Sequence, residues 1–172
     1  MKIFLSILFL LLNIGIKEDC EKLLINIFGN NVKTEFLKYD IAPELKNKIE
    51  QECRQRFIRN YVYVWKIYDN NKHIATAFLD DVYGKSLPIT FLVIFDLNGK
   101  ILDTEIIKYR ESYGNAVQEK NWLNQFKGKD ASSKFKTGDD ISSISGATIS
   151  ANSVSAGIKK LSKLYSYIKD EL

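Results

Sequence analysis

The spacing of apolar residues changes along the chain and divides it into helical and strand-forming parts. Residues 45–57 carry apolar side chains at four-residue spacing, and a second stripe of this kind runs through residues 154–168. Both segments are therefore predicted to form amphipathic helices. Further helical segments are predicted at residues 20–28, with Gly29 just past the end, and at residues 115–126.

The predicted helix boundaries depend on a few residues with known end preferences. We expect Asp40 to cap the helix that carries the 45–57 stripe, Pro43 to lie in its first turn, and the helix to end near Ile58. The last helix is expected to begin near Ala151. The polar stretch 128–143 shows no clear period and is longer than most connections, so it is either functional or mobile.

Between the two helical stripes the apolar period falls to two, which is typical of strands. Asn70-Asn71 and Asn98-Gly99 mark tight turns between consecutive strands. A meander of antiparallel strands with helices before and after it predicts a single-domain α+β fold. The predicted strands are residues 32–39, 61–68, 74–79, 88–95 and 101–109.

The first segment differs from the rest of the chain. After Lys2, residues 3–16 are almost entirely apolar, and a charged run follows at residues 17–19. This layout is typical of a secretory signal, and the segment is short for a membrane span. We therefore expect residues 1–16 to be a signal peptide or an N-terminal membrane anchor and residues 17–172 to be the domain. The protein is expected to be exported, to the periplasm or the extracytoplasmic side of the cytoplasmic membrane.

Composition narrows the possible chemistry. The 172 residues are 45% apolar, enough for one sizeable core, and the net charge of +4 is scattered, so nucleic acid is not an expected partner. With one histidine, His73, and two cysteines, neither a zinc site nor a histidine-based catalytic triad is supported, and we predict no catalytic and no metal-binding residues. Cys20 and Cys53 could form a disulfide after export, or Cys53 could be a buried small residue.

One stretch of small residues stands at the predicted start of the last helix. Ser145, Gly146 and Ala147 precede Thr148 and Ser150. Small residues at a loop-to-helix junction let backbone N–H groups approach a ligand, and the positive end of the helix dipole suits a phosphate. The alternative is that Thr148 or Ser150 simply caps the helix.

This stretch resembles the S/T-G-A-T signature of the FMN-binding domain family, found in the flavin-carrying subunits of the Rnf and Nqr redox complexes and in related exported flavoproteins. Other similarities follow in the same order, so that the resemblance covers about residues 60–172. They are Val82-Tyr83-Gly84 leading to Pro88-Ile89, Asp96 with Asn98-Gly99-Lys100-Ile101, Glu111-Ser112-Tyr113-Gly114, and Trp122-Leu123 with Gln125-Phe126 and Gly128.

The resemblance implies a cofactor, a site and partners. It implies that FMN is bound, that Thr148 carries it through a phosphoester made by a flavin transferase, and that the chain transfers electrons to redox partner proteins. It implies a carrier or oxidoreductase subunit rather than a stand-alone catalyst. The implied cofactor-binding residues are Ser145, Gly146, Ala147, Thr148 and Ser150 at the phosphate, with Tyr83, Gly84, Glu111 and Gly114 as candidates at the ring.

Two positions depart from the family pattern. Ser142 stands where covalently flavinylated members have an aspartate, and Tyr113 stands where the family turn has a proline. The first departure leaves covalent attachment open. It also leaves a rival hypothesis, a non-redox ligand-binding or interaction module that keeps the fold and has lost the flavin.

Overall fold

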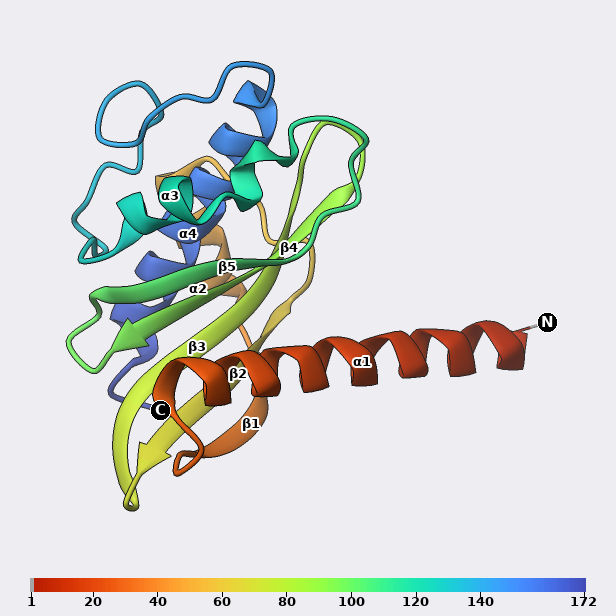
Figure 1. Cartoon of the computed structure of the whole chain (residues 1–172), viewed down its shortest axis with the longest axis vertical. Coiled ribbons are helices and arrows are strands. Elements are labelled where there is room, and N and C mark those ends of the chain that lie inside the picture. The colour runs from red at the N-terminus through yellow and green to blue at the C-terminus, as the bar shows by residue number, and fades with distance from the viewer. Residues whose placement is uncertain (1) are drawn as a thin grey trace.

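A single antiparallel sheet organises the molecule (Figure 1). The computed structural model describes the backbone of residues 2–172 and the side chains of residues 15–172. Each strand pairs with the next along the chain, so the predicted meander and the α+β class are confirmed, and the strand predicted at 32–39 adds to its edge. The strands are β1 Lys33–Asp40, β2 Tyr61–Asp69, β3 Lys72–Tyr83, β4 Pro88–Asp96 and β5 Ile101–Lys108.

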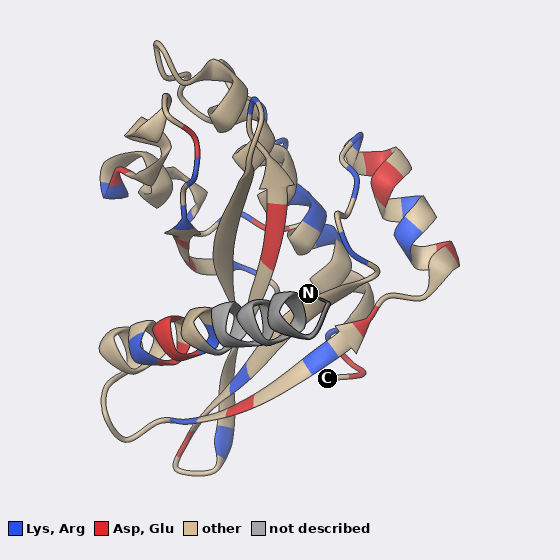
Figure 2. Ribbon diagram, turned by 90° about the vertical axis from the view of Figure 1, so that its right-hand side faces the viewer, with Lys and Arg blue, Asp and Glu red and all other residues tan. Residues whose placement is uncertain are grey.

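Helices cover both faces of the sheet. In Figure 1, α1 crosses one face, while α2 and α4 lie on the other. In Figure 2 the basic and acidic residues of the domain are interspersed over strands and helices, so this view shows no large patch of a single charge. The helices are α1 Lys2–Phe28, α2 Pro43–Cys53, α3 Lys120–Leu123 and α4 Thr148–Ile168, and the short 3-10 turns are η1 Asn115–Gln118 and η2 Asn124–Phe126.

Alternation along the strands gives the domain two separate hydrophobic cores. Val64 and Phe78 point into the larger core, which contains α2 and α4, whereas Trp65 and Ala77 point into a smaller core beneath α1. Cys20 lies in the smaller core and Cys53 in the larger one, and both thiols are free. The disulfide alternative is therefore wrong, and the prediction of Cys53 as a buried small residue is confirmed. Burial, with the charges of Asp19 and Glu21, raises the pKa of Cys20 to about 12.

Pro43 lies in the first turn of α2 as predicted, but the predicted cap and the predicted end of this helix are wrong. Asp40 is the last residue of β1, and no side chain caps the helix. At the other end the helix stops after Cys53, because Arg54 adopts a left-handed conformation with φ of 52°. The apolar stripe nevertheless continues through the loop: Phe57 is buried, and its backbone N–H donates to the Glu50 carboxylate over 2.8 Å. The four-residue spacing of apolar residues thus continues beyond the end of the helix.

The single helix predicted at 115–126 is also wrong. It is broken into η1, α3 and η2, because Glu119 is extended with φ of −64° and ψ of 125°. Val117, Trp122 and Phe126 still face the larger core. The break lets this segment follow the sheet edge and reach the loop that precedes α4.

The helix predicted at residues 20–28 ends as predicted, at Phe28, where Gly29 takes a left-handed φ of 95°. Its predicted start is wrong, because α1 is one continuous helix from Lys2 to Phe28. The predicted signal or anchor at residues 1–16 lies almost wholly outside the described side chains. Within the part of the chain that the structure describes, no helix is both long and apolar enough to cross a membrane.

Candidate functional site

The small-residue stretch forms a tight turn that leads into α4. The Ala147 N–H donates to the Ile144 carbonyl over 3.1 Å, and Gly146, third in the turn, has φ of 76°. A positive φ at this place is characteristic of a type II turn and explains why a glycine stands there. The helix then begins at Thr148, three residues before the predicted start at Ala151.

The start of α4 has no side-chain cap. Ala147 occupies the N-cap position, and no side chain accepts a hydrogen bond from the first turn. The alternative that Thr148 or Ser150 caps the helix is therefore wrong. Thr148 is exposed at the helix start, and the N–H groups of the first turn have no side-chain cap. These groups form the positive end of a 21-residue helix.

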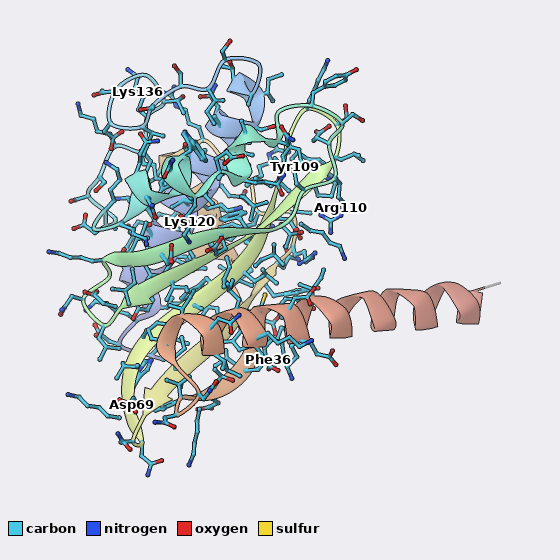
Figure 3. All side chains as sticks on the ribbon, in the orientation of Figure 1. Phe36, Asp69, Tyr109, Arg110, Lys120 and Lys136 are labelled. Atoms are coloured by element: carbon cyan, nitrogen blue, oxygen red, sulfur yellow. The ribbon has the colours of Figure 1, made fainter. Side chains whose placement is uncertain are left out.

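A tyrosine ties the helix start to the loop after β5. Figure 3 shows Tyr109 and Arg110 just beyond β5, near the end of the sheet where β3 turns into β4. The Tyr109 hydroxyl donates to the Tyr113 carbonyl over 2.5 Å and lies 3.0 Å from the Ser150 hydroxyl. A tyrosine hydroxyl has one proton, so Ser150 is the donor in the second bond. Ser150 is only 5% exposed and thus serves as a link between α4 and this loop.

Gly114 packs against the same helix start. A Cβ at this position would lie 2.9 Å from the Tyr109 hydroxyl oxygen, 3.1 Å from the Ser150 Oγ and 3.4 Å from the Ala147 Cα. Its φ of 83° is also a left-handed value that favours glycine. The predicted site residue Gly114 is therefore next to the start of α4.

The other predicted residues gather at the tip of the β3–β4 hairpin. The Glu111 Oε1 accepts hydrogen bonds from the backbone N–H groups of Ser86 (2.5 Å) and Leu87 (2.9 Å). These bonds, that of Leu87 above all, lower the pKa of Glu111. A Cβ on Gly84 would lie 2.7 Å from the same oxygen, so the carboxylate and the hairpin backbone are in close contact. Glu111 thus closes the hairpin tip, whereas Tyr83 is 58% exposed beside it.

The two groups lie at one end of the molecule. Glu111 contacts the hairpin tip and Gly114 contacts α4, and three residues of chain span at most about 11 Å. Sequence reasoning singled out Tyr113 as a departure from the family pattern, but it did not identify Tyr109 as a link or Leu87 and Ile149 as exposed apolar side chains at this end. The positions of these residues become clear only when segments that are distant in the sequence lie side by side in the fold.

The residues at this end fit a flavin phosphate and ring. An exposed threonine hydroxyl stands beside uncapped helix N–H groups, which suit a phosphate. Nothing lies within 4 Å of a Cβ built on Gly146, so the turn leaves room for close backbone approach. Exposed apolar side chains such as Tyr83 and Tyr113 can contact an aromatic ring system.

Asp140 is one of the residues that hold the stretch 128–143 in place. Asp140 accepts hydrogen bonds from the N–H groups of Phe135 and Lys136, at 3.1 and 2.7 Å, and pairs with the Lys129 ammonium at 2.9 Å. Burial alone would raise the pKa of Asp140, but these partners outweigh it and lower the pKa. The Thr137 hydroxyl also bonds to Asn152 of α4. Among the described residues, no group of acidic, histidine and cysteine side chains could hold a metal ion.

Comparisons with known proteins agree with this site. Residues 84–163 match the FMN-binding domain family, a range that includes the start of α4, Glu111 and Gly114. No curated protein matches the chain. Among solved structures, the crystal structure of NqrC from Shewanella oneidensis is similar, with 18% sequence identity, a TM-score of 0.56, and coverage of 85% of this chain and 86% of that chain. The expected resemblance to the FMN-binding domain family is thus confirmed by the family match over residues 84–163, and that match supports FMN as the cofactor.

Proposed function

We propose that this chain is an FMN-binding electron-transfer protein that exchanges electrons with partner proteins of an oxidoreductase complex. The observation that carries this proposal is the open start of α4, where an exposed Thr148 stands beside uncapped N–H groups inside the family match. The bound flavin would supply the redox chemistry, while the chain binds it, orients it and controls its contact with water. This role is that of a carrier or subunit, since it requires no acid or base from the chain.

In this proposal Thr148 holds the flavin through a phosphoester. Its Oγ would form a bond to the FMN phosphorus, and the hydroxyl proton would pass to solvent. The balance requires a leaving group, so the donor must be an activated flavin phosphate in which an anhydride bond breaks as the ester forms. A flavin transferase is the partner expected to supply this reaction.

The remaining predicted residues divide between the phosphate and the ring. Gly146 and Ala147 provide close backbone approach at the phosphate, while Ser145 lies exposed in the same turn. Tyr83 would contact the ring directly. Glu111 would act through the hairpin tip that it closes, because its carboxylate already accepts two backbone hydrogen bonds. Gly84 and Gly114 allow the segments that carry these residues to pack closely, and Ser150 fixes the helix start.

We further propose that the domain works outside the cytoplasm. Residues 1–16 would direct export and, if retained, would attach the domain to the cytoplasmic membrane. The apolar composition of this segment supports the proposal. The redox partners would then be reached on the extracytoplasmic side or in the periplasm.

Expression with and without a flavin transferase tests the proposal. Yellow protein with fluorescence that survives denaturing electrophoresis means covalent FMN, and colour that is lost on denaturation means reversible binding. Protein that stays colourless in both cases and takes up no added FMN would overturn the proposal. That result would favour the rival module without flavin, which the serine at position 142 supports.

Substitution of Ser142 sharpens the test of covalent attachment. The Ser142 side chain is exposed, so an aspartate can be placed there without disturbing the core. We predict that Ser142→Asp increases the labelled fraction obtained with the transferase, measured by intact mass, while Ser143→Asp, at the neighbouring exposed position, does not. Equal labelling of both variants and the wild type would show that this carboxylate is not needed.

A further inference from the structure

Two side chains from the segment after η1 bind both backbone polar groups of Ser142. The Trp122 indole N–H donates to the Ser142 carbonyl over 2.8 Å, and the Ser142 N–H donates to the Gln125 side-chain oxygen over 2.8 Å. The Gln125 amide nitrogen donates to the Trp122 carbonyl over 3.1 Å, which closes a ring of three hydrogen bonds. We call this arrangement of Trp122, Gln125 and Ser142 the clamp.

The clamp rests on the rigid part of the fold. Trp122 is buried and packs edge-to-face on Phe126, with ring centroids 5.1 Å apart. Phe126 is fully buried, and between them the Leu123 carbonyl accepts a hydrogen bond from Thr104 of β5. The clamp is therefore fixed to the sheet, and it holds Ser142 at a defined place relative to β5.

Only a short tether separates the clamp from the proposed attachment residue. Residues 143–147 join Ser142 to Thr148, and this tether contains the turn closed by the Ala147 N–H and the Ile144 carbonyl. Ala147 is buried and contacts Gly114, so the far end of the tether is fixed as well. The start of α4 is thus held from two directions.

We propose that Trp122 and Gln125 are positioning residues for the flavin-bearing turn. This inference rests on the proposed function. They act through the backbone of Ser142 and do not touch the flavin themselves. The clamp keeps the turn in one conformation before any ligand arrives, so that the Thr148 hydroxyl and the N–H groups of α4 are already arranged for the phosphate. Since the clamp uses only backbone atoms of residue 142, it should survive Ser142→Asp.

Three variants and a matched control test the clamp. Trp122→Phe keeps an aromatic ring but removes the indole N–H, and Gln125→Ala removes both of its hydrogen bonds. Gln125→Glu retains an acceptor for the Ser142 N–H but cannot donate to the Trp122 carbonyl, so it serves as a partial rescue. The control is Gln118→Ala, because Gln118 is exposed and its amide bonds only locally, to the Asn115 carbonyl at 3.4 Å.

The first measurement is amide hydrogen exchange in the flavin-free chain, beside global stability in urea. We expect protection of the Ser142 and Ala147 amides to fall at least about 10-fold in Trp122→Phe and Gln125→Ala, to stay near wild type in Gln118→Ala, and to recover in part in Gln125→Glu. Unchanged protection in both clamp variants would overturn the clamp. This measurement needs no flavin, so it tests the clamp even if the wild type binds no FMN. Failure of the wild type to bind FMN would overturn the proposed function but not the clamp.

The second measurement is the rate of covalent attachment by the transferase and the affinity for free FMN. Because a small misplacement of a reacting group costs much of its rate, we expect attachment to slow at least about 10-fold in Trp122→Phe and Gln125→Ala, with a near wild-type rate in the control and an intermediate rate in the partial rescue. Loss of amide protection together with unchanged attachment and affinity would overturn the positioning role.

Discussion

The start of α4 and the stretch around Lys160 have opposite surroundings. At its start, Thr148 is exposed and the first-turn N–H groups have no side-chain cap. Further along, Lys160 is fully buried: its ammonium lies 2.7 Å from the Asp80 carboxylate and donates to the Arg56 carbonyl over 3.0 Å. The difference shows how a rigid helix can present an open end. The buried contacts along the helix fix it in place, and its open start is then free to bind a ligand.

Breaking the buried ion pair of Lys160 and Asp80 should have the largest effect on stability. Lys160→Ala leaves the Asp80 carboxylate buried without its partner, and we expect a loss of about 3–5 kcal/mol in the free energy of unfolding, measured in urea. The double variant Asp80→Leu with Lys160→Met should recover most of this loss, since an apolar pair replaces the ion pair. A loss below about 1 kcal/mol in Lys160→Ala would contradict the claim that the buried contacts around Lys160 fix the helix.

A substitution at the open end should affect ligand binding more than stability. Gly114→Ala places a methyl group against Tyr109 and Ser150 and strains a left-handed backbone. We expect a stability loss of about 1–2 kcal/mol and a clear fall in FMN uptake, measured by fluorescence titration. The control is Gly99→Ala, where φ is 90° but nothing lies within 4 Å of the new Cβ. Equal FMN uptake in the two variants would separate Gly114 from the site.

Much of the fold could be predicted because strands and stripes are periodic. The meander was readable from the two-residue alternation, and the inward stripe of α4, from Val154 to Ile168, is buried as expected. The end of α2 was not readable, because Phe57 keeps the spacing although Arg54 has already left the helix. The break at Glu119 likewise has no signal in apolar spacing.

The site was predictable only in part. The small-residue signature located the start of α4, because its composition is unusual and local. The task of Glu111 in closing the hairpin tip depends on Ser86 and Leu87, about 25 residues earlier in the chain. The link from Tyr109 to Ser150 spans 41 residues. Contacts of this kind arise from tertiary packing and leave no pattern in a single sequence.

A smaller effect is expected from acid at the hairpin tip. The pKa of Glu111 is lowered in the fold, so its stabilising contribution is present above the unfolded value of about 4.3 and is lost as the pH falls through the folded value. The Ser86 and Leu87 amide resonances should therefore shift at low pH, as followed by NMR. Glu111→Gln should abolish this local titration, and a titration that persists in the variant would show that another group causes it.

The smallest change in stability is expected at the attachment residue itself. Thr148→Ala removes no cap, so the free energy of unfolding, measured in urea, should change by no more than about 0.5 kcal/mol. A loss of about 1 kcal/mol or more would show that the hydroxyl stabilises the helix, and would weaken the contrast between the start of α4 and the stretch around Lys160.

The intact mass of three proteins, each produced with a competent flavin transferase, tests the attachment of FMN at Thr148 most directly. We predict that the wild type gains the mass of one esterified FMN, that Thr148→Ser retains some of this gain because a hydroxyl remains at the same place, and that Thr148→Ala shows none while folding normally. A full FMN mass gain in Thr148→Ala would contradict the account.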